Sequence, residues 1–109
     1  MDKLGIITAI LNAGETPVES DVFQPFDIGC NYLIRTVTHI QTGRVVAVGA
    51  TEIVLEDAAW IADTGRFADA LENTEFSEVE PFPAGRRVIV GRGAVVDAVQ
   101  VVTLPRSQK

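Results

Sequence analysis

The sequence is poor in the residues that carry most site chemistry. Among its 109 residues there is one cysteine, Cys30, and one histidine, His39. A lone cysteine forms no internal disulfide, which fits a reducing compartment, and no Cys/His pair has zinc spacing. We expect Cys30 to be a small buried side chain, and His39, beside a turn, to be structural or solvated. Without a nucleophile and base in view, we expect no enzyme, no cofactor and no metal.

Basic residues and long apolar runs are also scarce. Nine lysines and arginines stand against 15 acids, a formal net charge of −6. That balance argues against a general phosphate-backbone binder, so we expect no nucleic-acid partner. No run approaches the roughly 20 apolar residues that span a bilayer, so we expect no membrane partner. The apolar stretch at residues 4–11 has no positive region before it, and we expect a soluble chain without a cleaved signal.

Residues 1–31 differ in character from the rest of the chain. Residues 3–12 have one apolar face and are compatible with a short helix. A strand over residues 5–11 competes, because Ile and Thr are branched at Cβ and stiff in helices. The segment that follows is acidic, contains two prolines and has no periodicity. It predicts an extended arm that lies along the domain or a partner, with Phe23 and Phe26 as its anchors.

Residues 32–109 have the pattern of a small β domain. Strands are predicted at residues 32–40, 44–48, 52–56, 86–92 and 94–104. A turn is predicted at residues 41–43, and a three-residue loop in which Gly49 supplies an unusual backbone angle joins the second and third strands. Ile53 and Leu55 alternate with more polar residues, which indicates that they face the core.

One short helix interrupts the strands. In "LEDAAWIADTGRF", residues 55–67, the pattern predicts a strand, a turn and the start of a helix over residues 64–73. Asp63 or Thr64 is the predicted N-cap. The helix places Phe67, Ala70 and Leu71 on one apolar stripe. An acidic, proline-bearing loop is predicted for residues 72–85.

Two glycines shape the last strands. Gly91 and Gly93 predict a bulge or sharp bend in a strongly curved sheet. Five short strands with a helix between the third and fourth then predict a mainly β fold. We expect a small SH3-like, strongly curved sheet or partly open barrel with one short helix, and an extended N-terminal arm. The predicted division is an N-terminal segment and arm, residues 1–31, and a barrel-like domain, residues 32–109.

Candidate interface residues are aromatic or basic. Trp60 is expected to cap the core, and the alternative is an interface anchor, since Trp and Arg are common hot-spot residues. The acids concentrate in residues 52–80, whereas most arginines lie outside that span. This predicts head-to-tail pairing of acidic and basic patches between copies. The full set of candidate interface residues is Phe23, Phe26, Trp60, Arg86, Arg87 and Arg92.

Three motifs in the chain resemble a known family. "LEDAAWIADTGRF", "EVEPFP" and "VIVGRG" lie within residues 32–99. Over this span the chain resembles a family of small, uncharacterised proteins encoded by tailed bacteriophages and prophages. The resemblance implies a phage origin and carries no catalytic residues with it. Residues 1–31 lie outside it.

The phage context favours a structural role. We expect a non-enzymatic virion component, a capsid decoration or minor head protein that binds a repeated lattice. Its expected partners are phage structural proteins such as the major capsid protein, with many copies or a homo-oligomer per particle. Its expected location is the virion, assembled in the bacterial cytoplasm.

Two alternatives stay open. One is a small non-virion module that modulates a host or phage protein through a groove near Trp60 and Tyr32. The other, nucleic-acid binding, requires one shared face for a set of arginines. These are Arg35, Arg44, Arg86, Arg87 and Arg92.

Overall fold

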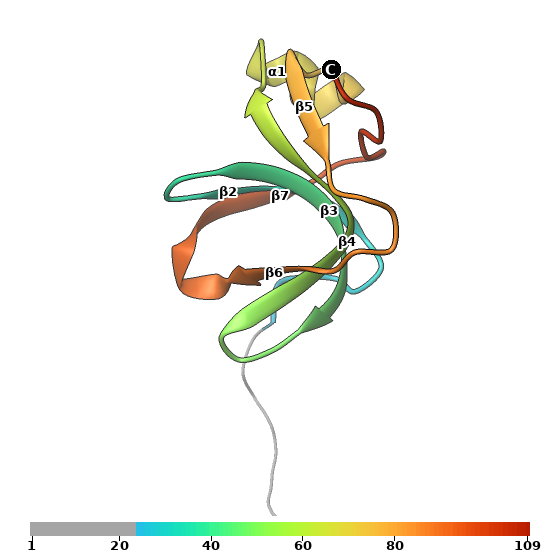
Figure 1. The fold of residues 1–109 in the computed structure, drawn as a ribbon. Coiled ribbons are helices and arrows are strands. Elements are labelled where there is room, and N and C mark those ends of the chain that lie inside the picture. Colours follow the sequence, from blue (N-terminus) through green and yellow to red (C-terminus); the bar gives the residue numbers. More distant parts are fainter. Residues whose placement is uncertain (1–23) are drawn as a thin grey trace, which may run out of the picture.

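The structure, a computed structural model, describes residues 24–109, and these form one strongly curved antiparallel sheet with a short helix (Figure 1). In chain order the elements are β2 (Asn31–Thr36), β3 (Ile40–Val48), β4 (Glu52–Asp63), α1 (Phe67–Asn73), β5 (Glu78–Pro81), β6 (Val88–Gly91), the 3-10 turn η2 (Arg92–Ala94) and β7 (Val95–Gln100). The predicted mainly β fold is confirmed. The helix or strand near residues 3–12 and the side chain of Phe23 lie outside the described residues.

The long strand β4 organises the sheet. One edge of β4 pairs with β3, while the other edge pairs first with β6 and then with β5. On the far side β3 pairs with β2, and β2 pairs with β7. The resulting series β6–β4–β3–β2–β7 curls into an open barrel. Within the described residues no ladder joins β6 to β7, which are linked through η2.

A bulge bends β4 where its two halves meet. Thr42 pairs with Ala59 and Arg44 with Glu56, so three steps along β4 oppose two along β3. Asp57, inside the bulge, has a φ of 52°, a left-handed backbone conformation that is uncommon outside glycine. This bend lets the first half of β4 join the barrel while its second half leaves it to pair with β5.

The predicted turn at residues 41–43 is wrong, because these residues lie inside β3. The chain reverses at residues 37–39 instead. Gly43 serves close packing: a Cβ there would lie 2.9 Å from the Cβ of Leu55 and 3.3 Å from that of Ala58. A glycine within a strand can mark a turn or a place where another part of the chain packs closely against the backbone. Gly43 is the second case.

The sheet has two hydrophobic clusters, one on each face. The barrel cluster contains Tyr32, Ile34, Val45, Ile53, Leu55, Ala58 and Val90. The outer cluster contains Leu33, Ala59, Ile61, Ala70, Phe76, Val79 and Val101. Successive strand residues point to opposite faces, which is why neighbours in β2 belong to different clusters. The predicted burial of Ile53 and Leu55 is confirmed.

The first described residues pack on the barrel. The Phe26 ring meets Tyr32 edge-on, with centroids 5.2 Å apart. The amide of Gly29 donates to the Val45 carbonyl at 2.7 Å, and the amide of Val45 donates to the Cys30 carbonyl at 3.0 Å. Cys30 is partly buried against the barrel cluster, less enclosed than predicted.

The helix is shorter than predicted. It begins at Phe67, and its N-cap is Arg66, with no side-chain cap bond. Asp63 instead accepts a hydrogen bond from the Gly65 amide at 2.9 Å, which stabilises the turn before the helix. Ala70 is the buried residue of the stripe, whereas Phe67 is 38% exposed. Leu71 is partly buried against the outer cluster, so the helix packs on the sheet through Ala70 and Leu71.

Three further expectations need correction. The predicted loop at residues 72–85 contains β5, in which Val79 points into the outer cluster. Gly49 has no positive φ. At Gly91 and Gly93 the sharp bend named in the prediction is present: Gly91 precedes a 3-10 turn and Gly93 lies in it. β6 and β7 are shorter than the strands predicted at residues 86–92 and 94–104.

Replacing Gly43 by alanine is expected to destabilise the fold by about 1–3 kcal/mol, because the added methyl overpacks the contact with Leu55. Urea unfolding followed by circular dichroism measures the change. Gly91→Ala is the matched control, since a Cβ at Gly91 meets nothing within 4 Å. Equal effects of the two substitutions would contradict the close approach.

Thr42→Val is expected to stabilise the protein by about 1 kcal/mol. The Thr42 side chain is fully buried, and its hydroxyl finds no hydrogen-bond partner among the described residues. Valine has nearly the same shape and removes a polar group that is desolvated without compensation. The midpoint of thermal unfolding should rise. A fall would mean that the hydroxyl is satisfied by water in solution.

Candidate functional site

An apolar groove of about 380 Å³ lies beside the second half of β4. Its floor and walls are His39, Gln41, Trp60, Glu80, Pro81, Phe82 and Pro83. Two aromatic rings and two prolines give it a rigid apolar lining, and the remaining residues are polar. This combination is typical of a surface that holds part of another molecule.

Three adjacent strands set the groove floor. Gln41 pairs with Trp60, and Trp60 pairs with Glu80, so the three side chains form one cross-strand row. The row exists because β5 extends the sheet beyond the barrel along β4. The groove is therefore built on regular backbone, which holds it in shape before any partner binds.

Trp60 is exposed, contrary to the expectation that it caps the core. Its exposed fraction is 44%, whereas its neighbours Ala59 and Ile61 are buried in the outer cluster. Phe82, across the groove, is 36% exposed. An exposed Trp next to an exposed Phe on a rigid floor matches the alternative reading, an interface anchor.

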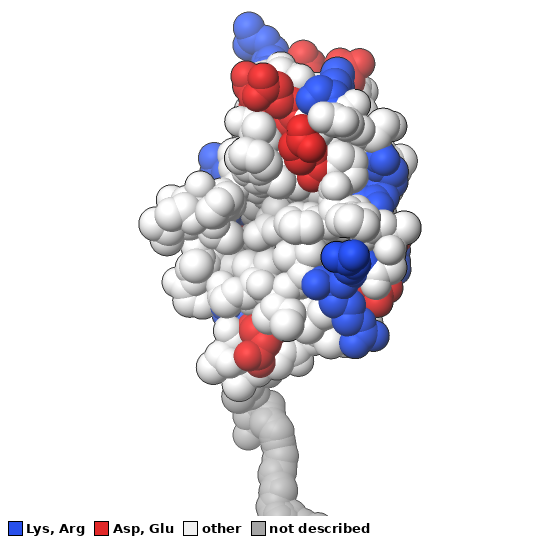
Figure 2. All heavy atoms as spheres, in the orientation of Figure 1, with Lys and Arg blue, Asp and Glu red and all other residues white. Residues whose placement is uncertain are grey.

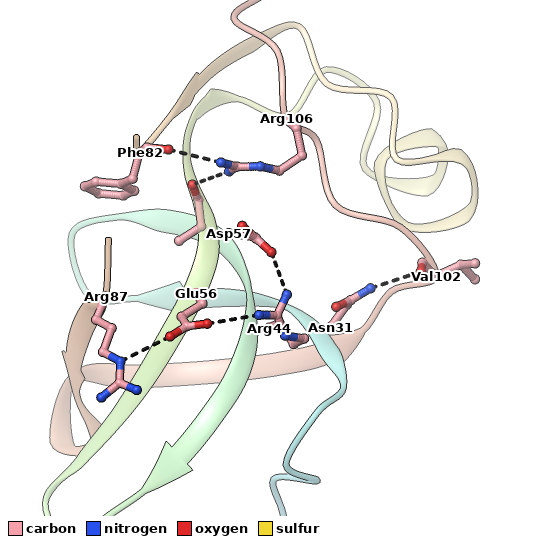
Figure 3. A network of polar contacts seen from close by, with 9 residues as sticks. Asn31, Arg44, Glu56, Asp57, Phe82, Arg87, Val102 and Arg106 are labelled. Carbon is pink, nitrogen blue, oxygen red and sulfur yellow. Dashed lines mark hydrogen bonds and ion pairs between the residues drawn. The ribbon is translucent and has the colours of Figure 1, made fainter. Parts of the chain in front are cut away.

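The C-terminal residues secure the groove wall. Arg106 donates one hydrogen bond to the Ala58 carbonyl at 3.0 Å and another to the Phe82 carbonyl at 3.2 Å (Figure 3). Lys109 pairs with Val79 through two backbone hydrogen bonds. Arg106 thus links the Phe82 backbone to the bulge of β4, and Lys109 links the C-terminal residues to β5. Both contacts stabilise the wall of the groove.

An ion-pair network runs along the bulge. Arg44 pairs with Asp57 at 2.6 Å and with Glu56 at 3.1 Å, and Arg87 pairs with the other Glu56 oxygen at 3.1 Å (Figure 3). The hydrogen bond from Arg44 lowers the pKa of Asp57, and the positive charges of Arg44 and Arg106 act in the same direction. The same bond raises the pKa of Arg44.

A second ion pair lies on β2 and β7. Arg35 donates two hydrogen bonds to Asp97, and this bonding lowers the pKa of Asp97 and raises that of Arg35. The Arg35 guanidinium also lies 5.0 Å above the Phe67 ring, a cation–π contact. These contacts explain why Phe67 stays outside the core.

The ion pair at Asp57 predicts a pH effect. A carboxyl whose pKa is lowered by folding stabilises the protein above its ordinary value of 3.8, and this stabilisation is lost as the pH falls through the lowered value. Arg44→Met should therefore be less stable than the unmodified chain at neutral pH, and the difference should shrink in acid. Urea unfolding at a series of pH values measures this. A difference independent of pH would assign the effect to packing of the Arg44 side chain.

The other predicted site residues are distributed around the barrel. Arg86 is exposed and makes no ion pair with another described residue, whereas Arg92 donates to the Gly49 carbonyl at 2.7 Å. Phe26 packs on the barrel, and Tyr32 is buried, so Tyr32 takes no part in the groove. Of the predicted site residues that the structure describes, Trp60 alone lines the groove.

Sequence reasoning missed most of the groove. Pro81, Phe82 and Pro83 were assigned to a loop, although "EVEPFP" has the alternation of a short strand followed by rigid residues. Reading Glu78–Pro81 as a strand next to β4 would have placed Phe82 beside Trp60. His39 and Gln41 carried no signal of their own.

Among residues 24–109, no three His, Cys, Asp or Glu side chains come together so as to hold a metal ion. No helix in this part of the chain is long and apolar enough to cross a membrane. Comparison of the chain with protein families, curated proteins and solved structures found no match.

Proposed function

We propose that this chain is a non-enzymatic, protein-binding component of a tailed-phage particle, a capsid decoration or minor head protein. The groove at Trp60 is its contact surface. The observation that carries the binding role is an exposed Trp and Phe on a rigid, braced floor. The phage setting rests on the resemblance of residues 32–99, and the partner proteins are phage structural proteins that include the major capsid protein.

The surface chemistry suits such a contact. Charged side chains of both signs gather around α1 and β5 in Figure 2, while the middle of that face is uncharged. The groove lining combines two aromatic rings and two prolines with Glu80, and such an apolar contact with charge beside it gains affinity from the apolar part and selects partners through the charged part. Of the five arginines that a nucleic-acid face would require, three (Arg35, Arg44 and Arg87) are held in ion pairs, which weakens that alternative.

Mass spectrometry of purified particles from the phage or prophage that encodes this chain tests the proposal. The expected result is a fixed, high number of copies per major capsid subunit. Absence from the particle would overturn the virion role. It would leave the non-virion binding module, which predicts a monomer with one discrete partner and is tested by pull-down with the groove variant Trp60→Ala as control.

A further inference from the structure

We propose that the groove of one copy is filled by residues 17–23 of a second copy, with Phe23 on Trp60. The inference rests on the proposed function and deepens it, because it names the chain that the groove binds. In this arrangement each copy binds the next copy in the lattice, and the groove is the binding site for the arm that contains Phe23.

The side-chain pattern of the segment fits the groove. Residues 17–23 read "PVESDVF". In an extended chain, alternate side chains point the same way, so Glu19, Asp21 and Phe23 share one side. Docking Phe23 against the exposed rings of Trp60 and Phe82 turns both acids toward the same protein surface.

Positive charge lies at one end of the groove to receive these acids. The Arg86 amide donates to the Pro83 carbonyl at 3.2 Å, which brings the exposed Arg86 next to the groove wall. Arg87 follows, with 68% of its side chain exposed, but it is paired with Glu56, so Arg86 is the arginine here without an ion pair among the described residues. Glu80, directly opposite Trp60 on β5, lines the groove and accepts a hydrogen bond from Gln108 at 3.1 Å, so its negative charge keeps the acids of the segment away from the Trp60 end. Charge therefore orients the segment, with Phe23 at Trp60 and the acids toward Arg86.

The position of the described N-terminal end favours a groove on another copy. In Figure 1 the described chain starts at the end of the barrel away from α1 and β5. Phe26 is held there by Tyr32, and Gly29 is held by Val45. Only two residues separate Phe23 from Phe26, a short tether for a return to the groove of the same chain. Binding to the next copy gives a heterologous, head-to-tail contact that repeats.

Photo-crosslinking of the full chain tests this contact. Phe23 is replaced by p-benzoylphenylalanine, and chains labelled with 14N and 15N are mixed in equal amounts before irradiation. The expected products join a light and a heavy chain and map to Trp60 or to residues 80–83. Products within single chains alone would show closure on the same copy and overturn the proposal. Products that map elsewhere would overturn it as well.

Sedimentation velocity over a concentration series supplies the second measurement. Phe23→Ala and Trp60→Ala should each weaken self-association by about 30-fold, as expected for a hot-spot aromatic residue. Arg86→Glu should weaken it too, and Asp21→Arg in the same chain should restore it. The matched control is Phe67→Ala, which removes an exposed ring outside the groove.

The two proposals fail in different ways. Intact self-association in Phe23→Ala, together with loss of Trp60→Ala from particles, would overturn the proposed occupant while the particle role stands. Inter-chain crosslinks in a protein absent from particles would overturn the virion role while self-docking stands.

Discussion

Replacing Leu55 by alanine is expected to lower the free energy of unfolding by about 2–5 kcal/mol, the usual range for truncating a buried leucine. Leu55 is fully buried at the centre of the barrel cluster. It pairs with Val45 on β3 and with Val88 on β6, so three strands pack against the cavity that alanine would leave. A domain of this size has a total stability of about 5–15 kcal/mol, and the variant should be close to unfolding at physiological temperature.

Urea unfolding followed by circular dichroism measures this loss. The matched control is Ile89→Ala on the adjacent strand β6, because Ile89 is 70% exposed and its truncation leaves no cavity. A surface substitution of this kind usually changes stability by about 0.5 kcal/mol or less. Similar losses in both variants would contradict the assignment of Leu55 to the centre of the core.

The barrel was predictable where side chains alternate. Ile53 and Leu55 lie in a strand with one buried face, and alternation reveals such a strand. The order of strands and the single helix follow from the spacing of these patterns. The turn was misplaced because Gly43 was read as a turn residue, whereas its lack of a side chain is required by Leu55 from another strand. The local sequence pattern around a residue does not reveal which residues of other strands it will contact.

The candidate site was less predictable, for a related reason. In "DAAWIAD" apolar residues are continuous, so periodicity does not tell which side Trp60 faces. The bulge at Asp57 shifts the alternation along β4, and a non-glycine residue with positive φ gives no warning in sequence. β5 is short and acidic and ends in proline, features that mimic a loop. Without β5 the groove has only one wall.

The C-terminal residues show how the site depends on the whole chain. Arg106 reaches both the bulge, at Ala58, and the groove wall, at Phe82. One side chain from the end of the sequence therefore couples the bend of β4 to the position of an aromatic ring. These two hydrogen bonds fix the backbone at Phe82 before a partner binds. Less conformational entropy is therefore lost when the partner binds.

Under the virion role proposed above, Trp60→Ala is expected to abolish incorporation of the protein into particles while leaving its fold intact. Trp60 forms the centre of the groove, and truncation of a hot-spot Trp typically costs binding about 2–4 kcal/mol, a loss of roughly 30- to 1,000-fold in affinity. Because the ring is 44% exposed and packs on neither hydrophobic cluster, the free energy of unfolding should change by about 1 kcal/mol or less.

Complementation measures the first effect: phage lacking the gene is grown with each variant supplied in trans, and copies per particle are counted. Circular dichroism measures the second, since the variant has no Trp for fluorescence. Phe67→Ala is the control, because it removes a ring of similar exposure outside the groove and should be incorporated normally. A destabilisation of about 3–5 kcal/mol in Trp60→Ala would place the ring in the core after all, since that is the cost of emptying a buried aromatic site. Normal incorporation of a stable Trp60→Ala variant would show that the groove is not the contact with the particle. The exposed arginines would then be tested, beginning with Arg86.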